Sequence, residues 1–212
     1  MATLVVERRS RTRRGPAAES PLRSFARFVV YLGLGAVSGL GSTWYVLENG
    51  ISLDRVRSGP WVLRADAGQP VADPYTSAYI ARTGHIPMRL DGAMYFTATT
   101  DGDGAELQGN CSYTVYGTAP SGAWWALSLH DREGNLVDNP AKRYSFSSTN
   151  VLFEEEGRFR VSVSPTARAG NWLPTGGADV FLLMLRIHGP DPAYVRDPGS
   201  AIMPMIDLEK CA

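Results

Sequence analysis

The chain has 212 residues, of which 44% are hydrophobic and 20% are charged, and its formal net charge is zero. These proportions are typical of a folded globular protein and exclude a wholly disordered chain, a collagen-like repeat and a polytopic membrane protein. Two cysteines without paired spacing exclude a disulfide-rich scaffold and a structural zinc site. Because nucleic acids are bound mainly through clustered Lys and Arg, we expect no nucleic-acid partner for a chain that is neutral as a whole.

The charge is divided unevenly along the chain. Residues 1–27 contain seven arginines and two glutamates and carry a net charge of +5, whereas the rest carries −5. Between them, Phe28–Leu47 has no charged residue. About 20 residues at ~1.5 Å each cross the ~30 Å hydrocarbon core of a bilayer, so this segment is predicted to be a transmembrane helix. Because arginine-rich flanks stay inside, residues 1–27 are expected to be a cytoplasmic tail and the chain after Leu47 to be periplasmic.

Three alternatives compete with this membrane anchor. A cleaved signal peptide has a shorter apolar region of about 7–15 residues, although residues 36–38 are a potential cleavage site. A twin-arginine export signal disagrees with the Gly-Pro-Ala that follows Arg13-Arg14. A buried helix of a soluble domain is disfavoured because each glycine weakens it by about 1 kcal/mol. The segment has four, Gly33, Gly35, Gly39 and Gly41. We therefore favour a single-pass anchor in a bacterial inner membrane.

Gly35 and Gly39 form a small-xxx-small motif on the predicted helix. This spacing lets two membrane helices approach closely, which makes a homodimer through these glycines a candidate. Glycine is also common in membrane helices that do not dimerise, so both interpretations stay open.

The segment after the predicted membrane helix divides into three parts. Glu48–Pro60 is predicted to be a linker because it contains Asn-Gly and Gly-Pro breaks. Within Val71–Ile80, Asp73 fits a helix N-cap and the following proline fits the first helical position, which predicts a short helix. The β domain is expected to span residues 61–200, and residues 201–212 are expected to form a C-terminal tail.

From Ala93 onward the sequence predicts strands rather than helices. The predicted strands are Met94–Thr99, Cys111–Tyr116, Trp124–His130, Lys142–Phe146, Arg158–Ser164 and Val180–Ile187. Arg158–Ser164 alternates apolar and polar residues and is therefore expected to have one solvent-exposed face. Val180–Ile187 is apolar on nearly both faces, as in a central strand that is covered on two sides. Short strands joined by turns predict a mainly β protein, a jelly-roll-like antiparallel β-sandwich with one short helix, preceded by a single transmembrane helix.

The sequence contains no familiar catalytic motif, neither G-x-S-x-G nor S-x-x-K. Its three histidines, His85, His130 and His188, include no close His-x-His pair, so we expect no metal and no cofactor. His130 and His188 would meet if their strands were neighbours, with Asp131 beside them. A small-molecule hydrolase or lyase that uses these three side chains is therefore the alternative function.

The pairing of Cys111 and Cys211 is left open by the sequence. In an oxidising compartment a disulfide between them would close a loop of about 100 residues and stabilise the fold by up to ~4.7 kcal/mol in the chain-entropy model. Without pairing, the cysteine near the C-terminus is an exposed thiol.

Four segments resemble motifs of the bacterial family known as domain of unknown function 1214, DUF1214. They are Trp124–Asp131 (WWALSLHD), Asn139–Tyr144 (NPAKRY), Asn171–Pro174 (NWLP) and Leu185–Pro190 (LRIHGP). The resemblance covers about residues 61–190, with His130 and His188 at positions where the family usually has tyrosine. It implies a jelly-roll-like fold, often found beside a DUF1254 half for which this sequence shows no counterpart, and it implies no particular activity.

These motifs are compatible with a structural scaffold and with a ligand-binding site. As scaffold, Asn171 would hydrogen-bond its own turn, Trp172 and Leu173 would bury apolar area, and Pro174 would fix the loop exit. As a ligand site, aromatic walls and one arginine would suit an anionic or carbohydrate-like ligand. The residues expected to line such a cleft are Trp124, Arg143, Tyr144 and Trp172.

Arg186 interrupts an apolar strand, so if it is buried it needs a partner, and Asp131 and Asp138 are the candidates. No reaction follows from any of these residues. The favoured function is therefore a non-enzymatic envelope protein, in which a membrane-tethered β-sandwich binds a ligand or partner in the periplasm.

Overall fold

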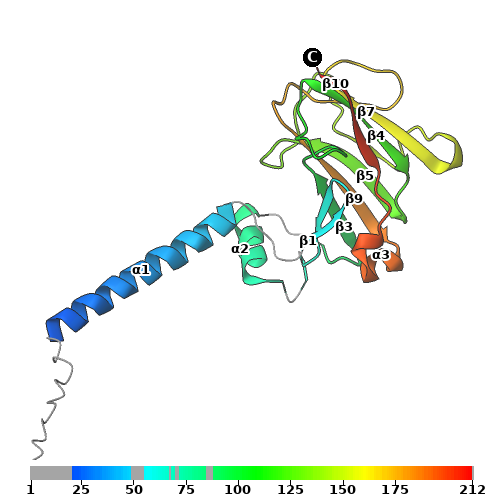
Figure 1. Cartoon of the computed structure of the whole chain (residues 1–212). Helices are drawn as coiled ribbons and strands as arrows, with labels where there is room; N and C mark the ends of the chain where they lie inside the picture. The colour runs from blue at the N-terminus through cyan, green and yellow to red at the C-terminus, as the bar shows by residue number, and fades with distance from the viewer. Residues whose placement is uncertain (1–20, 49–54, 67, 70–71, 85–87, 212) are drawn as a thin grey trace, which may run out of the picture. The chain divides into compact units, whose positions relative to one another are not determined.

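The computed structural model describes residues 21–48, 55–66, 68–69, 72–84 and 88–211 (Figure 1). It divides the chain into two units, Met1–Asn49 and Gly50–Ala212. The first unit contains α1, Pro21–Glu48, a 28-residue helix without a buried residue. Its length and composition are sufficient to cross a membrane. The helix includes the predicted apolar segment and begins one to two turns before it.

The larger sheet of the second unit has six strands in the order β1-β2-β3-β9-β5-β6, and all neighbours are antiparallel. β9 lies between β3 and β5, so the C-terminal part of the chain completes the middle of this sheet (Figure 1). The strands are β1 Arg55–Ser58, β2 Trp61–Arg64, β3 Ala93–Ala98, β5 Gly122–His130, β6 Ser145–Ser147 and β9 Leu182–Pro190.

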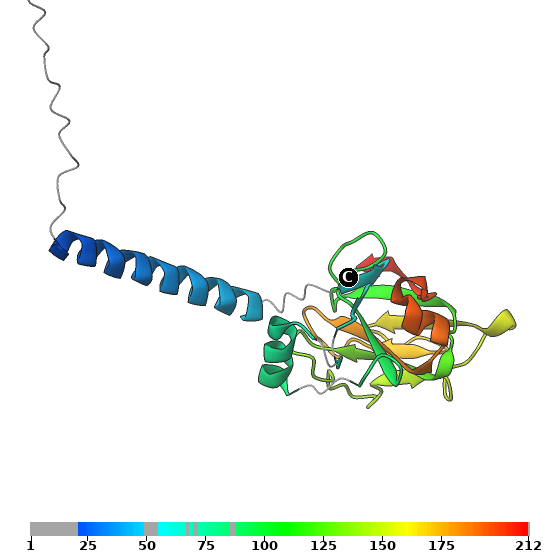
Figure 2. The same ribbon diagram turned by 90° about the horizontal axis from the view of Figure 1, so that it is seen from below.

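The smaller sheet has four strands in the order β10-β4-β7-β8, antiparallel except for the parallel pair β7–β8. They are β4 Cys111–Thr118, β7 Arg158–Ser164, β8 Trp172–Pro174 and β10 Met205–Cys211. Figure 2 shows the strands of the domain in a view from below, with β10 in red. The two sheets confirm the predicted mainly β sandwich.

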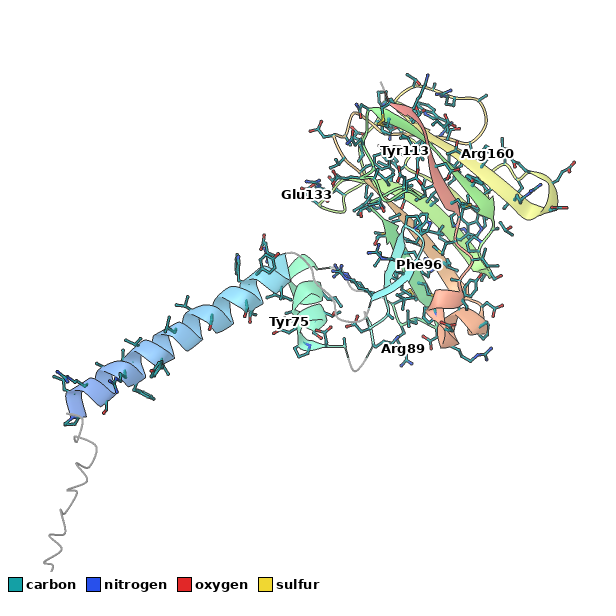
Figure 3. All side chains as sticks on the ribbon, in the orientation of Figure 1. Tyr75, Arg89, Phe96, Tyr113, Glu133 and Arg160 are labelled. Atoms are coloured by element: carbon teal, nitrogen blue, oxygen red, sulfur yellow. A yellow bond between two sulfur atoms is a disulfide. The ribbon has the colours of Figure 1, made fainter. Side chains whose placement is uncertain are left out.

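The hydrophobic core lies between the two sheets. Trp125, Leu127 and Leu129 of β5 are buried on one face, as the predicted alternation requires. The Trp125 ring packs 4.8 Å, between centroids, from the ring of Phe159 in the smaller sheet. Phe96 of β3, labelled in Figure 3, belongs to the same core and is fully buried. The sandwich is therefore held by apolar side chains that both sheets contribute.

Helix α2, Pro74–Thr83, confirms the predicted short helix. The Asp73 carboxylate accepts hydrogen bonds from the backbone N–H groups of Tyr75 and Thr76, at 2.8 and 3.1 Å. Gly84 ends the helix with a φ of +68°, a conformation that glycine adopts without steric cost. Three further short helices were not predicted: η1 Glu155–Gly157, α3 Pro192–Arg196 and η2 Pro198–Ser200.

Two predicted boundaries of the β domain are wrong. The predicted linker contains β1, whose Val56 packs against the core, and the predicted C-terminal tail contains β10, whose Ile206 is fully buried. Both are edge strands that pair with a single neighbour. Each of these strands turns a single apolar residue toward the core, which is too weak a periodic signal for sequence analysis to detect.

The predicted strand Val180–Ile187 corresponds to β9, but one face of this strand is buried more fully than the other. Leu183, Leu185 and Ile187 are fully buried, whereas Met184 and Arg186 on the other face are half-buried. The sandwich has one core, so the second face of β9 lies on the outside of its sheet. The predicted strand Lys142–Phe146 is also shifted, since β6 begins at Ser145 and the preceding residues form a turn.

Cys111 and Cys211 form a disulfide that the sequence left open. The two residues lie directly opposite each other in the register of β4 and β10. The bond therefore fastens the last strand of the chain to the sheet, and Cys111 is nearly inaccessible at 1% exposure.

We predict that the double variant Cys111→Ala/Cys211→Ala lowers the free energy of unfolding by about 2–4 kcal/mol, because the unfolded chain regains the entropy of a long open loop. Urea denaturation of the full chain in detergent measures this change. Dithiothreitol should reproduce the loss in the unsubstituted chain and have no effect on the variant. Two reactive thiols in the unreduced, denatured protein would contradict the disulfide.

Candidate functional site

A pocket of about 520 Å³ lies where the turn before β6 faces the loop before β8. We name it the Arg143 pocket, and its lining includes Ala141, Lys142, Arg143, Tyr144, Phe146, Asn150, Leu152 and Asn171. Its volume falls within the range of small-molecule sites, which is about 300–1,000 Å³. Two of the four motif segments, NPAKRY and NWLP, contribute residues to its lining.

Asn139 fixes the turn that carries Arg143. It is 5% exposed, and its Nδ2 donates to the backbone carbonyls of Val137 and Arg143, at 3.2 and 3.0 Å. Its Oδ1 accepts from the Arg143 backbone N–H at 3.1 Å, and the Lys142 N–H donates to the Asn139 carbonyl at 2.9 Å. The turn leaves the Lys142 backbone at a φ of +49°, in the left-handed region that residues other than Gly and Asn rarely adopt.

Asn171 fixes the opposite wall of the pocket. It is 7% exposed, and its Nδ2 donates to the carbonyls of Leu152 and Arg160, both at 2.8 Å. Its Oδ1 accepts from the Leu152 N–H at 2.8 Å. The prediction that this asparagine bonds its own turn is therefore wrong, because it joins the loop at Leu152 to strand β7. Leu173 and Pro174 are buried behind it, consistent with the scaffold interpretation.

Arg143 connects the two walls. Its guanidinium donates from Nη1 to the Trp172 carbonyl at 3.1 Å, and its central carbon lies 5.8 Å from the centroid of the Trp172 ring and 5.7 Å from that of Phe146. The Trp172 indole N–H in turn donates to Ser164, to the carbonyl and to Oγ at 3.1 Å each. Arg143, although exposed, thus contacts both walls through one hydrogen bond and two cation–π contacts.

Tyr144 faces the same pocket and donates its hydroxyl to Oδ1 of Asp138 at 2.9 Å. This hydrogen bond, with smaller effects from burial and the charge of Asp138, raises the pKa of the Tyr144 phenol above its ordinary value. The phenol therefore stays protonated at neutral pH and is a hydrogen-bond donor to Asp138 rather than a base.

Trp124 is not part of this pocket. It lies on the outer face of the larger sheet, where its ring packs edge-on against His188 at 5.3 Å between centroids. Leu129, whose backbone N–H donates to the Tyr144 carbonyl, is five positions further along β5, or roughly 16 Å. The structure thus brings three of the four expected cleft residues together and places the fourth elsewhere.

Arg186 also lies on this outer face. It is half-buried, its guanidinium carbon lies 5.9 Å from the Tyr95 ring centroid, and its Nε donates to the Met184 sulfur at 3.3 Å. The expected pairing with Asp131 or Asp138 is therefore wrong. Tyr95 is directly opposite Arg186 on the neighbouring strand, so an aromatic ring takes the place of the carboxylate.

His130 and His188 do not meet. His130 pairs in register with Leu182 and His188 with Trp124, so they lie six positions, or about 20 Å, apart along the sheet. His130 is buried, with Nδ1 donating to the Gly134 carbonyl at 2.9 Å and Nε2 at 2.8 Å from the Ser128 hydroxyl. A carbonyl only accepts, which assigns the proton to Nδ1.

Asp131 completes the turn after β5, the turn that carries Glu133 (Figure 3). Its Oδ1 accepts from the backbone N–H of Asn135 at 2.7 Å. Desolvation acts to raise the pKa of Asp131, but the hydrogen bonds from Asn135 and from the backbone of Glu133 and Gly134 together outweigh it, so the pKa is lowered. The structure thus keeps His130 and His188 apart along the sheet, so the three side chains of the hydrolase or lyase hypothesis do not converge on one site. His85 lies outside the described residues.

No three His, Cys, Asp or Glu side chains gather as metal ligands within the part of the chain that the structure describes. A second pocket, also of about 520 Å³, is lined by residues that include Gln108, Asn110 and Asp179 but no Lys or Arg. The two pockets therefore differ in charge rather than in size.

The fold and these loops define a two-sheet β-sandwich domain in a chain that also has an apolar N-terminal helix. Residues 92–192 match the model of the family described as "Protein of unknown function (DUF1214)". This match over residues 92–192 confirms the resemblance of the motifs to that family. No curated protein was found to match the chain.

Solved structures with a similar fold include the following two. The crystal structure of the VPA0106 protein from Vibrio parahaemolyticus has a TM-score of 0.59 at 17% identity, over 92% of this chain and 47% of that chain. This chain therefore spans about half of that protein, and the likeness shows the fold alone. An uncharacterized protein from Burkholderia cenocepacia has a TM-score of 0.38 at 17% identity, over 57% of this chain and 30% of that one.

We predict that Asn171→Ala destabilises the protein by about 1–3 kcal/mol, because it leaves buried backbone groups of β7 and the Leu152 loop without partners. The exposed Asn135, changed to alanine, is the control and should alter stability by no more than about 0.5 kcal/mol. Urea denaturation of the full chain compares the two. Equal effects of both variants would show that Asn171 does not join the loop to the strand.

Proposed function

We propose that this protein is a membrane-tethered binding protein whose β domain lies outside the cytoplasm and takes up a ligand or partner at the Arg143 pocket. The observation that carries the proposal is the convergence of the NPAKRY and NWLP segments on one pocket, with Arg143 held between them. Packing alone does not require an arginine to be fixed at the mouth of a pocket, since a freely moving arginine would lose less conformational entropy.

Two features support the location. Helix α1 has the length and composition of a membrane span, and the positive charge of residues 1–27 favours a cytoplasmic N-terminus. The disulfide between Cys111 and Cys211 supports an oxidising compartment for the β domain, because thiols are kept reduced in the cytosol. These features agree with a domain in the periplasm of a bacterium.

Reporter fusions test the location. Alkaline phosphatase fused after Ala212 should be active and a fluorescent cytoplasmic reporter at the same position should be silent, because the β domain is expected to be outside. The fusion should also stay in the membrane fraction after carbonate extraction, owing to the apolar helix. An inactive phosphatase with a fluorescent reporter would reverse the topology, and release by carbonate would exclude the anchor.

A pocket-filling variant tests the binding site. Ala141 lines the pocket, so Ala141→Trp should block it, whereas Ala105→Trp, at an exposed turn elsewhere, is the control. Benzyl alcohol, benzylamine and benzoate are titrated into the full chain in dodecyl maltoside, and the indole N–H signal of Trp172 is followed by NMR. At least one probe should shift this signal in the unsubstituted chain and the control but not in Ala141→Trp. No shift with any probe contradicts the binding site.

A further inference from the structure

We infer that the Arg143 pocket binds its ligand through an oxyanion, a carboxylate or a phosphate group, joined to an apolar body. The inference rests on the proposed function, because it specifies the chemistry of the same pocket. It follows from the charge of the lining, from the hydrogen-bonding groups that are left there, and from the way in which Arg143 is held.

The charge of the lining is positive. Lys142 and Arg143 both line the pocket, and its lining includes no Asp or Glu side chain. Neither cation takes part in a salt bridge within the described stretches of the chain. The carboxylate of Asp138, which is not part of the lining, accepts the hydrogen bond of the Tyr144 hydroxyl. The two adjacent positive charges therefore favour an anion from outside the protein.

The side-chain nitrogens at the pocket offer donors. The Arg143 guanidinium has five N–H groups, and one of them is given to the Trp172 carbonyl. The Asn150 Oδ1 atom accepts a hydrogen bond from the Ser147 backbone N–H at 2.6 Å, so the side-chain oxygen is used and the Nδ2 group is the donor that this side chain offers. The Asn171 amide, by contrast, uses both its donor and its acceptor within the protein. A ligand rich in acceptors, such as a carboxylate or phosphate, fits this set.

Arg143 is prepared for such a ligand. The Trp172 carbonyl and the rings of Phe146 and Trp172 restrict the guanidinium without any ligand, and this restriction lowers the entropy lost on binding. Lys142 is placed beside it by a left-handed backbone conformation that disfavours lysine. The 66%-exposed Leu152 also lines the pocket and offers apolar contact to the rest of a ligand, whereas Phe146 is mostly buried in the core.

The test compares probes that share a phenyl ring and differ in charge, on the full chain in dodecyl maltoside, again with the Trp172 indole N–H signal as readout. Benzoate and phenyl phosphate represent the two sources of an oxyanion, and benzyl alcohol is the neutral counterpart. We expect at least one of the two anions to bind about tenfold more tightly than benzyl alcohol, because the Arg143 guanidinium donates charge-assisted hydrogen bonds to an oxyanion but not to a neutral hydroxyl. The anion that binds more tightly identifies the source.

Two substitutions locate the charge. Arg143→Gln should weaken binding of the preferred anion about tenfold and change benzyl alcohol binding less than about twofold. Lys142→Asn should weaken anion binding about threefold, and it keeps the fold because asparagine tolerates the left-handed conformation. Arg196→Gln removes one exposed positive charge elsewhere and should have no effect.

The outcomes separate this inference from the proposed function. If benzyl alcohol binds as tightly as both anions, and Ala141→Trp blocks it, the pocket is a binding site but not an oxyanion site. Unchanged anion affinity in both Arg143→Gln and Lys142→Asn likewise overturns the inference. If none of the probes shifts the Trp172 signal, the oxyanion site and the pocket both fail.

Discussion

The geometry of the pocket depends on the hydrogen bonds of two buried asparagines. Asn139 closes the turn that carries Lys142 and Arg143, and Asn171 joins the Leu152 loop to β7. A buried amide is stable only when its donors and acceptor are paired, so each asparagine fixes the backbone groups that it bonds. Arg143 then spans the two fixed walls through the Trp172 carbonyl. The same contacts that stabilise the loops thus position the cation.

The two ends of the β domain are held by different means. β1 lies at the edge of the larger sheet through backbone pairing with β2, whereas β10 is both paired with β4 and linked to it by the disulfide. Edge strands bond to one neighbour only and separate more readily than central strands. A covalent bond at the last strand therefore suits the proposed location outside the cytoplasm, where the reductants of the cytosol are absent.

The larger sheet separates side chains that the sequence allowed to meet. Because β5 and β9 are antiparallel, His130 and His188 come from opposite ends of the outer face, and Trp124 stays with His188. Arg143 and Trp172, 29 positions apart, come into contact since β6 and β8 lie at neighbouring edges of the two sheets. Strand order and direction, rather than distance in sequence, decided which candidate residues form a site.

Sequence analysis was sufficient to predict the apolar helix, the mainly β fold, most strand positions and the DUF1214 motifs, because these depend on local composition, on the period of apolar residues and on fixed spacing. It also predicted the cap of α2 at Asp73, which is a local interaction. The pairing of Cys111 with Cys211, the long-range hydrogen bonds of Asn171 and the set of residues that line the pocket became visible in the folded structure alone. Each of these joins residues that are distant in the chain, and their contact depends on strand order and register, which local patterns do not specify.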